Sequence, residues 1–540
     1  MVSCSLNNEQ KYSFFYSNDI LKNIFLVCCY ISDFNPKMNR PIMPEIKLLQ
    51  KNIVETFLCG EGNTLLKALQ ENGFDIYSPC GGNGTCGKCM VYVKGEGEVT
   101  SCIYPVTNDI EIVLPEKREA NILVEQHEHT IEMPFNPGDT VGFSSFPYGV
   151  AIDIGTTTLV FYLVNLISGA IIETRAVVNP QSKYGADVIS RINFAALNDG
   201  GLETLQKEIL YTINLQLDHF IEVAEITNNE LVKITIAGNT TMLHLLLGVD
   251  PLPIALAPFT PAFVDEQILK GKELQLHCHP EAEIKILPSI AAYVGADIVA
   301  GIASIKPLGE YQRFLFLDIG TNGELALVTP ETIWCCATAA GPAFEGANIS
   351  CGMSAVEGAI SVFGTEGYSV IGNAAPVGLC GSGLIDVVAH LVENKLVQND
   401  GLLSEDFVIV PETSEKNSIV LTQQDIREVQ LAKSAILAGV KVLLKKASLT
   451  FDDLDVLFLA GGFGNYIDLE SAVKIGMLPK EMEHKTISLG NTSGTGALLA
   501  LKSVQFDQII QDIRNRSCYI ELSEEEDFVL DYVMNMDFEM

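Results

Sequence analysis

The chain contains the same strand-turn-strand pattern twice, and this repeat limits its possible folds more than any other feature. The first copy, YGVAIDIGTTTLVFYLV, begins at Tyr148, and the second, RFLFLDIGTNGELALV, begins at Arg313. In each copy an aspartate ends an apolar strand, and glycine and threonine follow it in the turn. One such hairpin alone is equally consistent with an ordinary tight turn. Two copies predict duplicated half-domains that face one another across a cleft.

The residue types in the two turns suit a magnesium-nucleotide site. Glycine lets backbone N–H groups approach phosphate oxygens, and threonine and asparagine side chains donate hydrogen bonds to those oxygens. An aspartate can hold Mg²⁺ through water, so we assign Asp153 and Asp318 to magnesium and phosphate as catalytic residues. Glu324 either orients the attacking water or forms a structural salt bridge, and both interpretations stay open. The predicted phosphate-binding residues are Gly155, Thr156, Thr157, Gly320, Thr321, Asn322 and Gly323.

A third glycine-rich loop ends the apolar run of VLFLAGGFGNY at residues 456–466. A buried strand that ends in glycines presents a flat backbone, and an adenosine moiety can lie against such a surface. This loop therefore predicts the adenosine site. Its residues are Gly461, Gly462, Phe463 and Gly464.

Near the N-terminus, the sequence CGGNGTCGKC places three cysteines in a glycine-rich loop, and a fourth follows twelve residues later. Thiolates at this spacing can turn toward one small inorganic centre, and the glycines bring backbone N–H groups close to its sulfides. The loop predicts a 2Fe-2S cluster, although the plant-type pattern has a shorter first spacing. A structural zinc site and unliganded thiols are the alternatives, but zinc sites more often use paired CxxC knuckles or histidine. The predicted ligands are Cys80, Cys86, Cys89 and Cys102.

The residues around these cysteines have the pattern of a small ferredoxin. IKLLQ and VETFLCG predict two short strands, and Asn63 is the predicted cap of a helix over TLLKALQENG. VYVKGEGEV predicts a hairpin, and the alternation in DIEIVLP predicts an edge strand. The predicted organisation is an N-terminal extension that is poorly ordered (1–43), the ferredoxin domain (44–117), a linker (118–147), the first half-domain (148–310), and the second half-domain with the adenosine loop and a C-terminal helix (311–540).

Composition limits the partners and the compartment. The formal net charge of -34 argues against nucleic acid or an anionic membrane surface, because both are bound through clustered Lys and Arg. The run from Ile24 to Ile31 is too short to span a bilayer, which needs about 20 apolar residues. Fourteen cysteines without a convincing secretory signal indicate a reducing compartment. We therefore expect a cytoplasmic protein of anaerobic metabolism.

The three loops, in this order, resemble those of the acetate kinase, sugar kinase, heat-shock chaperone and actin superfamily. The resemblance implies an α/β multidomain fold, in which a β-grasp-like 2Fe-2S ferredoxin is followed by a linker and two ribonuclease-H-like halves. It extends further, because four runs together with the ferredoxin resemble the reductive activators of corrinoid proteins. This second resemblance covers about residue 44 to the C-terminus. The four runs are AGNTTMLHLLLGVDP, GPAFEGANISCGM, CGSGLID and TQQDIREVQLAKSAI.

The residues of two of these runs also predict local structure independently of the resemblance. In the last run, Thr422 and Asp425 predict a capping box at the start of a long, mainly buried helix. The resemblance places Gln430 and Lys433 of that helix among the candidate nucleotide contacts. In AGNTTM, Asn239 is equally consistent with an ordinary helix N-cap and with a residue that lines the cleft.

The resemblance to the corrinoid activators implies a function for the fusion of a ferredoxin with an ATP cleft. It implies ATP-dependent electron transfer from the 2Fe-2S cluster to a corrinoid protein of a methyltransferase system, which returns Co(II) to Co(I). An upstream electron donor would reduce the cluster, and we expect a homodimer. One alternative is an ATP-driven activator of another low-potential enzyme. The other is a small-molecule kinase with a regulatory ferredoxin domain.

Overall fold

The structure is a computed structural model. It describes residues 43–50, 53–60, 62–74, 76, 78, 82, 84, 88–114, 130–138, 145–305, 311–320, 322–412, 418–461 and 466–538. The predictions made for residues 1–42, Cys80, Cys86, Thr321 and 462–464 lie outside these ranges. Among the described residues, no helix has both the length and the apolar character needed to cross a bilayer.

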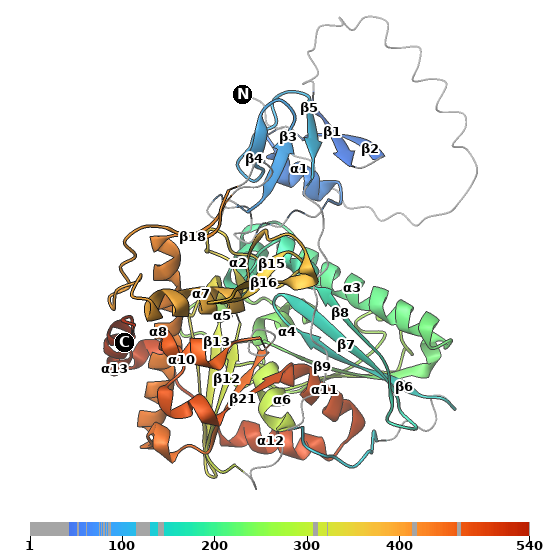
Figure 1. The fold of residues 1–540 in the computed structure, drawn as a ribbon. Coiled ribbons are helices and arrows are strands. Elements are labelled where there is room, and N and C mark those ends of the chain that lie inside the picture. The colour runs from blue at the N-terminus through green and yellow to red at the C-terminus, as the bar shows by residue number, and fades with distance from the viewer. Residues whose placement is uncertain are drawn as a thin grey trace, which may run out of the picture.

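A small mixed sheet with one helix on it forms the N-terminal domain (Figure 1). The strand order is β2-β1-β5-β3-β4, and β1 and β5 are parallel. Leu65, Leu66 and Leu69 of the helix are buried in the same apolar cluster as Ile46 and Ile112 of the sheet. This arrangement agrees with the predicted β-grasp-like ferredoxin. Its elements are β1 (Glu45–Gln50), β2 (Ile53–Leu58), α1 (Leu65–Glu71), β3 (Met90–Val93), β4 (Gly97–Thr100) and β5 (Ile110–Val113).

Two details of this domain differ from the predictions. β5, which was predicted as an edge strand, lies between β1 and β3 at the centre of the sheet. The prediction is wrong because alternation shows only that one face of a strand is buried, and a central strand can share that pattern. The cap of α1 is Thr64, whose hydroxyl accepts from the N–H of Lys67, while the predicted cap Asn63 donates to Glu71.

The first half-domain is built on a six-stranded sheet in the order β10-β11-β9-β6-β7-β8. β6 and β9 are buried along almost their whole length and are mostly apolar, as is usual for parallel neighbours that other layers cover on both faces. The elements are β6 (Tyr148–Ile154), β7 (Thr158–Asn165), β8 (Ile171–Val178), η1 (Pro180–Lys183), α2 (Val188–Leu197), α3 (Gly201–Val223), η2 (Asn228–Glu230), β9 (Leu231–Gly238), α4 (Thr240–Leu247), α5 (Leu252–Ala255), β10 (Gln267–Lys270), β11 (Glu283–Ile286) and α6 (Ala296–Ser304).

The second half-domain repeats this plan in a sheet of the order β21-β20-β12-β13-β14-β22. In both sheets an antiparallel hairpin that contains the predicted turn lies beside a parallel strand from later in the chain. The predicted duplication is therefore confirmed. The sheet and its helices comprise β12 (Phe314–Ile319), β13 (Gly323–Val328), β14 (Ile333–Thr338), α8 (Gln423–Ala447), η5 (Phe451–Asp453), β20 (Val456–Ala460), α10 (Leu469–Lys474), η6 (Lys480–Lys485), β21 (Thr486–Gly490), α11 (Thr492–Lys502), α12 (Phe506–Arg516), β22 (Ser517–Tyr519), η7 (Leu522–Glu524) and α13 (Glu526–Met534).

An insertion between β14 and α8 adds two small sheets to the second half-domain. Its helix α7 packs on β15 and on α10, so the insertion is part of the same apolar core as α8. Its elements are η3 (Pro342–Glu345), β15 (Ala359–Gly364), β16 (Gly367–Val370), η4 (Ile371–Asn373), β17 (Gly378–Leu379), α7 (Gly381–Glu393), β18 (Phe407–Val410) and β19 (Ile419–Leu421).

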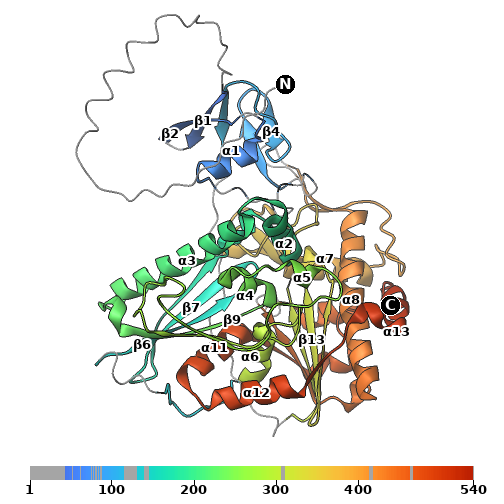
Figure 2. The same cartoon turned by 180° about the vertical axis from the view of Figure 1, so that it is seen from behind.

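The two half-domains share a core. Helices α6 and α11 pack on one another, and α11 also contacts β6 and β9 (Figure 2). Phe161 of the first sheet and Phe316 and Phe458 of the second belong to one buried cluster. The predicted turns of β6 and β12 therefore approach one another from the two sheets.

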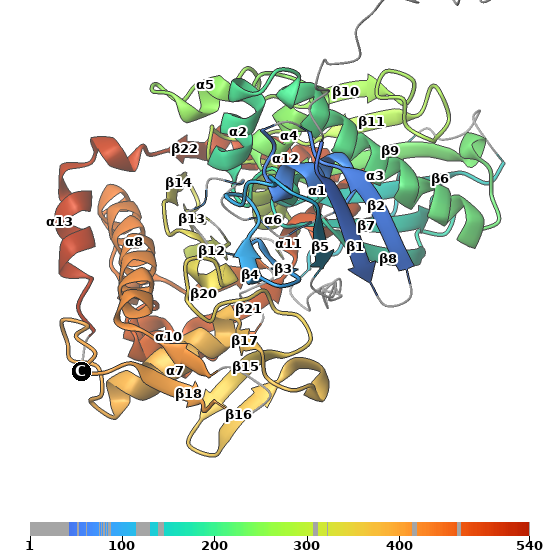
Figure 3. The ribbon, with the colours of Figure 1, turned by 90° about the horizontal axis from the view of Figure 1, so that it is seen from above.

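The ferredoxin domain lies above the two half-domains in the view of Figure 1, and Figure 3 looks down on it from that side. It is hydrogen bonded to both half-domains. On the side of the first half-domain, Gln70 Nε2 donates to the carbonyl oxygen of Lys183 at 2.9 Å. On the side of the second, Lys88 Nζ donates to the carbonyl oxygens of Ile349 and Gly352 at 3.0 and 3.1 Å. The residue Lys88 comes directly before the predicted cluster ligand Cys89.

Candidate functional site

The two predicted aspartates occupy equivalent positions at the ends of parallel strands. Asp153 of β6 pairs with Ala237 of β9, and Asp318 of β12 pairs with Ala460 of β20. Because parallel strands end at the same edge of a sheet, each turn lies beside the end of the neighbouring strand. In the first half-domain this places Asn239, which follows β9, against the first turn.

Asn239 is the helix N-cap that its sequence allowed, and it also contacts the first turn, while a ligand contact stays a prediction. Its side-chain oxygen accepts from the N–H of Met242 and caps α4. Its Nδ2 donates to Thr156 Oγ1 of the first turn at 3.0 Å. The residue therefore holds the turn as well as the helix.

Five carboxylates gather where the two half-domains meet. Burial, followed by the charges of Asp153 and Glu345, raises the pKa of Asp318 to about 7. Burial and the nearby Asp318 likewise raise the pKa values of Asp297 and Glu324, and burial raises that of Asp153. A cation nearby would favour the ionised form of carboxylates that oppose each other's ionisation in this way.

The chemistry of this donor set fits Mg²⁺. Magnesium prefers oxygen ligands and usually keeps several of its waters, so carboxylates can hold it without all of them touching it. Among the described residues, no three His, Cys, Asp or Glu side chains are close enough to ligate one ion directly. Asp153 and Asp318 would therefore hold the ion largely through water, together with the phosphates.

Asp153 is held by two residues that the sequence analysis did not identify. Asn491 Nδ2 donates to its Oδ2 at 2.9 Å, and Ser493 Oγ donates to its Oδ1 at 2.7 Å. Asn491 also caps α11 through the N–H of Gly494. The run GNTSGTG after a strand was a signal for such a helix start, but it gave no indication that the partner would be Asp153.

The first turn is also held by Arg191, which is completely buried. Its Nη2 donates to the carbonyl oxygen of Thr156 at 2.5 Å and its Nε to that of Gly185 at 2.8 Å. Burial lowers the pKa of this guanidinium to about 9, while Asp187 and Glu345 act in the opposite direction. At neutral pH Arg191 remains charged and places a cation near Asp187 and Glu345.

Glu324 lies in β13 directly opposite Asp318. Burial and then the charges of Asp297 and Asp318 raise its pKa well above the usual value. Within the described part of the chain, no Lys, Arg or His forms an ion pair with it. The side chain is therefore a member of the carboxylate group, and its catalytic role stays a prediction.

The adenosine loop begins against the carboxylates. Gly461 follows β20 with a φ of +88°, and a Cβ on it would lie 2.5 Å from Asp318 Oδ1. Any larger residue would collide with the aspartate and would also be strained. The start of this loop and the second turn, with its described residues Gly320, Asn322 and Gly323, thus form one wall of the site.

The described part of the cysteine loop fits a cluster site. Cys89 and Cys102 are both buried in the core of the ferredoxin domain. Their backbones are neighbours, because Ser101 donates its N–H and its hydroxyl to the carbonyl oxygen of Cys89 at 2.9 and 2.7 Å. Gly82 turns back toward them with a φ of +85°, and a Cβ on it would lie 3.9 Å from that of Cys102.

The candidate contacts on α8 have other partners. Gln430 Nε2 donates to the carbonyl oxygen of Met536 at 2.7 Å, and Lys433 Nζ donates to that of Asp537 at 2.5 Å. Lys433 Nζ also lies 5.0 Å from the centre of the Phe538 ring. Both side chains thus bind the C-terminal segment, and a nucleotide contact for them stays a prediction. The capping box of Thr422 and Asp425 that starts this helix is confirmed.

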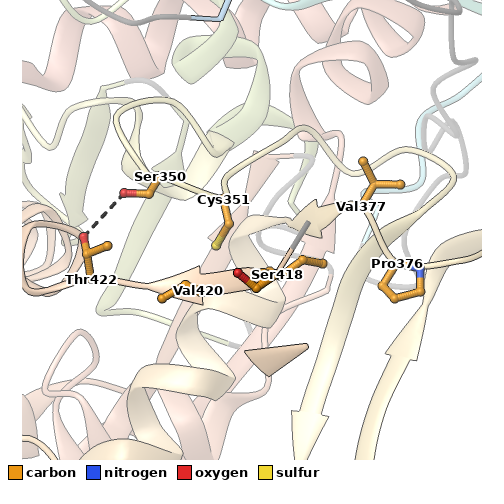
Figure 4. Close-up of a pocket in the computed structure, with 8 residues that line it drawn as sticks. Ser350, Cys351, Pro376, Val377, Ser418, Val420 and Thr422 are labelled. Atoms are coloured by element: carbon orange, nitrogen blue, oxygen red, sulfur yellow. Dashed lines mark hydrogen bonds between the residues drawn. The ribbon is translucent and has the colours of Figure 1, made fainter. Parts of the chain in front are cut away.

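A pocket of about 600 Å³ lies away from the carboxylates, beside the loop that accepts Lys88 (Figure 4). Ser350 and Cys351 line one side of it, and Thr422, at the start of α8, lines another. Ser350 Oγ and Thr422 Oγ1 are 3.4 Å apart, and the N–H of Ser350 donates to Asp425 at 2.7 Å. The loop is therefore tied to α8 as well as to the ferredoxin domain.

The chain matches three protein families along its length. Residues 50–111 match the 2Fe-2S iron-sulfur cluster binding domain. Residues 148–306 match the RACo middle region, and residues 312–540 match the C-terminal domain of RACo, the ASKHA domain.

Two relatives and one solved structure match most of the chain. The corrinoid activation enzyme RamQ of Eubacterium limosum is 31% identical over an alignment of 563 residue positions, which covers 86% of this chain and 94% of the relative. A Co(II) methylated amine-specific corrinoid protein reductase of Methanosarcina barkeri is 25% identical over 400 residues, which cover 67% of this chain and 72% of the relative. A solved reductive activator for a corrinoid, iron-sulfur protein has a TM-score of 0.65 and 30% identity, and the match covers 92% of this chain and 98% of that one.

Proposed function

The chain belongs to the family of reductive activators of corrinoid proteins, and we propose how its residues perform this activity. It is an ATP-dependent reductase that returns the Co(II) corrinoid of a partner protein to Co(I) for methyl transfer. Its cofactors are a 2Fe-2S cluster, ATP and Mg²⁺. The proposals that follow concern the residues that hold these groups, the electron donor and the assembly.

The carboxylate site and the two turns bind the magnesium nucleotide. Asp153 and Asp318 face the ion from the two half-domains, and Asn491 and Ser493 keep Asp153 in place. The turns donate backbone and side-chain hydrogen bonds to the phosphates, while the loop that begins at Gly461 receives the adenosine. Because the ligands come from both half-domains, binding of the nucleotide favours one relative position of the halves over others.

Cys89 and Cys102, together with Cys80 and Cys86, are the proposed cluster ligands. The cluster supplies one electron at low potential to the partner's corrinoid. The protein around it excludes water from two of the ligands, since Cys89 and Cys102 are buried. A separate upstream donor must reduce the cluster after each transfer.

Several further assignments complete the proposal. We divide the chain into an extension (1–43), a ferredoxin domain (44–117), a linker (118–147) and half-domains at 148–310 and 311–540. We place the protein in the cytoplasm of an anaerobic cell, where thiol ligands remain reduced. We expect a homodimer, which sedimentation at several protein concentrations would test.

One observation supports the coupling of ATP to electron transfer: the ferredoxin domain is hydrogen bonded to both half-domains that form the nucleotide site. The test mixes the reduced protein with a Co(II)-corrinoid protein under anaerobic conditions and follows Co(I) absorbance with and without Mg-ATP. We expect ATP to accelerate Co(I) formation strongly. Asp153→Ala and Asp318→Ala should lose the ATP effect and ATP hydrolysis by orders of magnitude while the cluster spectrum stays unchanged.

The control is a cluster-free variant, Cys89→Ser, which should still bind ATP but pass no electron. Equal rates of Co(I) formation with and without ATP would contradict the proposed coupling. If ATP were instead consumed in proportion to a phosphorylated small molecule, the kinase alternative would replace it.

A further inference from the structure

The ferredoxin domain makes two separate attachments, one to each half-domain, and each attachment continues to one of the nucleotide turns. On the first side, Gln70 Nε2 and Ser78 Oγ both donate to the carbonyl oxygen of Lys183, at 2.9 and 3.4 Å. Lys183 is the last residue of η1. The cap of η1, Asn179, is buried and connects this short helix to the first turn.

The connection from η1 to the first turn is direct. Asn179 Nδ2 donates to the carbonyl oxygen of Gly155 at 2.8 Å, and its backbone N–H donates to that of Thr157 at 2.8 Å. A displacement of the first turn must therefore displace η1 or break these hydrogen bonds. Only residues 180–182 separate Asn179, which binds the turn, from Lys183, whose carbonyl oxygen accepts from Gln70.

On the second side, Lys88 is held by a compact loop. Its Nζ donates to the carbonyl oxygens of Ile349, Ser350 and Gly352 at 3.0, 3.5 and 3.1 Å. The loop closes on itself, because Gly346 and Gly352 each pass so close to its own backbone that a Cβ would not fit. A loop closed in this way moves as a unit, since its backbone is packed as tightly as a protein interior.

The same loop continues from a residue of the nucleotide site. Glu345 ends η3 directly before Gly346, and its charge raises the pKa of Asp318. A Cβ on Gly320 of the second turn would lie 3.7 Å from Glu345 Oε1. The segment from Glu345 to Gly352 thus lies beside the second turn at its first residue and accepts hydrogen bonds from Lys88 near its last.

We propose that the ferredoxin domain bridges the cleft as a sensor of the spacing between the two nucleotide turns, with Gln70 and Lys88 as its positioning residues. This inference rests on the proposed nucleotide site. A nucleotide that changes the separation of the turns also changes the separation of the carbonyl groups of Lys183 and Ile349. The ferredoxin domain is one rigid body attached to both carbonyl groups. When their separation changes, the docking of this domain changes too, and the cluster ligand next to Lys88 is repositioned.

Adjacency alone does not establish coupling, but thermodynamic linkage provides a test. If nucleotide binding alters the docking, weakening the docking must alter the affinity for nucleotide by the same factor. The experiment uses the full-length, cluster-loaded protein and titrates it calorimetrically with the magnesium complex of a non-hydrolysable ATP analogue. The variant Lys88→Met removes the hydrogen bonds to the second half-domain, and Gln70→Met removes the shorter of the two hydrogen bonds to Lys183. Both substitutions keep the length of the side chain.

Lys94→Met is the matched control. Lys94 belongs to the same domain, but its Nζ binds Glu111 at 2.6 Å within that domain and contacts no carbonyl group among the described residues of the half-domains. The visible spectrum of the cluster verifies that each variant is folded and loaded. Hydrogen exchange at residues 346–353, with and without the analogue, gives a second measurement that is independent of turnover.

We expect Lys88→Met and Gln70→Met to shift the Kd of the analogue by about fivefold or more, the lower end of typical coupling factors. The analogue should alter hydrogen exchange in the loop of the unaltered protein and have less effect in Lys88→Met. If the unaltered protein binds the analogue and all three variants keep its Kd within twofold, the sensor is overturned while the nucleotide site stands. If the unaltered protein does not bind it, the nucleotide site itself is wrong, and the sensor with it.

Discussion

The side chain of Asn491 donates a hydrogen bond of 2.9 Å to Asp153, a residue 338 positions earlier in the chain. Asn491 is the N-cap of α11, and Asp153 lies one residue before the end of the first strand of the other half-domain. The carboxylate that we propose for the nucleotide site of the first half-domain is therefore oriented by a helix from the second. This contact requires that the two halves stay together for the site to be complete.

Replacing Asn491 should impair ATP hydrolysis without removing any residue that touches the nucleotide. Asn491→Ala leaves Asp153 Oδ2 without its donor, and Ser493→Ala does the same for Oδ1. Loss of such an orienting partner typically costs about 10- to 100-fold in metal affinity or activity. Phosphate release at saturating ATP, measured over a range of Mg²⁺ concentrations, checks this expectation.

Ser503→Ala, at the far end of α11, serves as the control, because Ser503 binds Gln505 rather than an aspartate of the site. It should retain near-normal hydrolysis. Normal rates of ATP hydrolysis in Asn491→Ala and Ser493→Ala at low Mg²⁺ would show that hydrogen bonds from the start of α11 are not required to orient Asp153.

Binding of the magnesium nucleotide should weaken as the pH falls. The pKa of Asp318 is raised to about 7, chiefly by burial, so the carboxyl is largely protonated below that pH. Magnesium favours the ionised form and must displace this proton. One proton with this pKa makes the affinity about tenfold lower at about pH 6 than at about pH 8, and the affinity levels off at higher pH. Calorimetry in buffers of different ionisation enthalpy gives both the Kd and the number of protons released.

The Asp318→Asn variant separates this effect from the titration of the phosphates. It should bind more weakly at every pH and release fewer protons. The same pH dependence in the variant and in the unaltered protein would assign the proton to another group.

Serine at either described cluster ligand should abolish or severely weaken the cluster. Cys89→Ser and Cys102→Ser remove thiolates that lie in the buried core of the ferredoxin domain. After anaerobic reconstitution, the unaltered protein should contain about two irons per chain, as a 2Fe-2S centre requires. Iron and sulfide analysis together with the visible spectrum measures both.

Cys59→Ala provides a matched control within the same core. Cys59 is also fully buried in the ferredoxin domain, but it follows β2 and lies outside the glycine-rich loop. This variant should keep its iron. Stoichiometric zinc in the reconstituted, unaltered protein would favour a structural zinc site over the 2Fe-2S cluster and would exclude the redox function.

The C-terminal segment should stabilise the second half-domain. Phe538 is buried in the same apolar cluster as α8, and Lys433 Nζ lies 5.0 Å from its ring centre. Phe538→Ala should lower the free energy of unfolding by about 3 to 5 kcal/mol, as for other buried phenylalanines. The single tryptophan, Trp334, lies in β14 of this half-domain, so its fluorescence during urea unfolding reports the local transition.

Val529→Ala tests whether shortening any side chain near the C-terminus lowers the free energy of unfolding. Val529 lies on α13 with 65% of its surface exposed, and its truncation should change the free energy by no more than about 0.5 kcal/mol. Equal, small changes in both variants would show that the segment contributes little to the fold.

Much of the fold could be predicted because local signals and tertiary structure agree. The first repeat begins at Tyr148, where β6 begins, and the second begins at Arg313, one residue before β12. Both strands are buried on two faces, so each is an apolar run up to its aspartate, and a reader can find such a run without an alignment. The capping box at Thr422 was predictable for the same reason, since all of its partners lie within one turn.

The remainder of the site could not be predicted because its partners are distant in the chain. Asp297 lies in an ordinary-looking helix start, and only the assembled fold brings it beside Asp318. Arg191 is one basic residue among many in the sequence, and its burial against Thr156 depends on the packing of α2. Periodicity predicts which face of an element is buried, but it contains no information about which other element covers that face.

Leu114, which follows β5, and Thr130, which pairs with Ile305, are joined by a covalent connection that sets an upper limit on their separation. Even a fully extended backbone between these two residues spans at most about 55 Å. A covalent connection of this reach keeps a domain at an effective concentration on the order of millimolar near its docking site. Dilution therefore cannot separate the electron carrier from the ATP site in the intact chain. The same two parts, made as separate polypeptides, would meet only at the concentrations at which they are mixed.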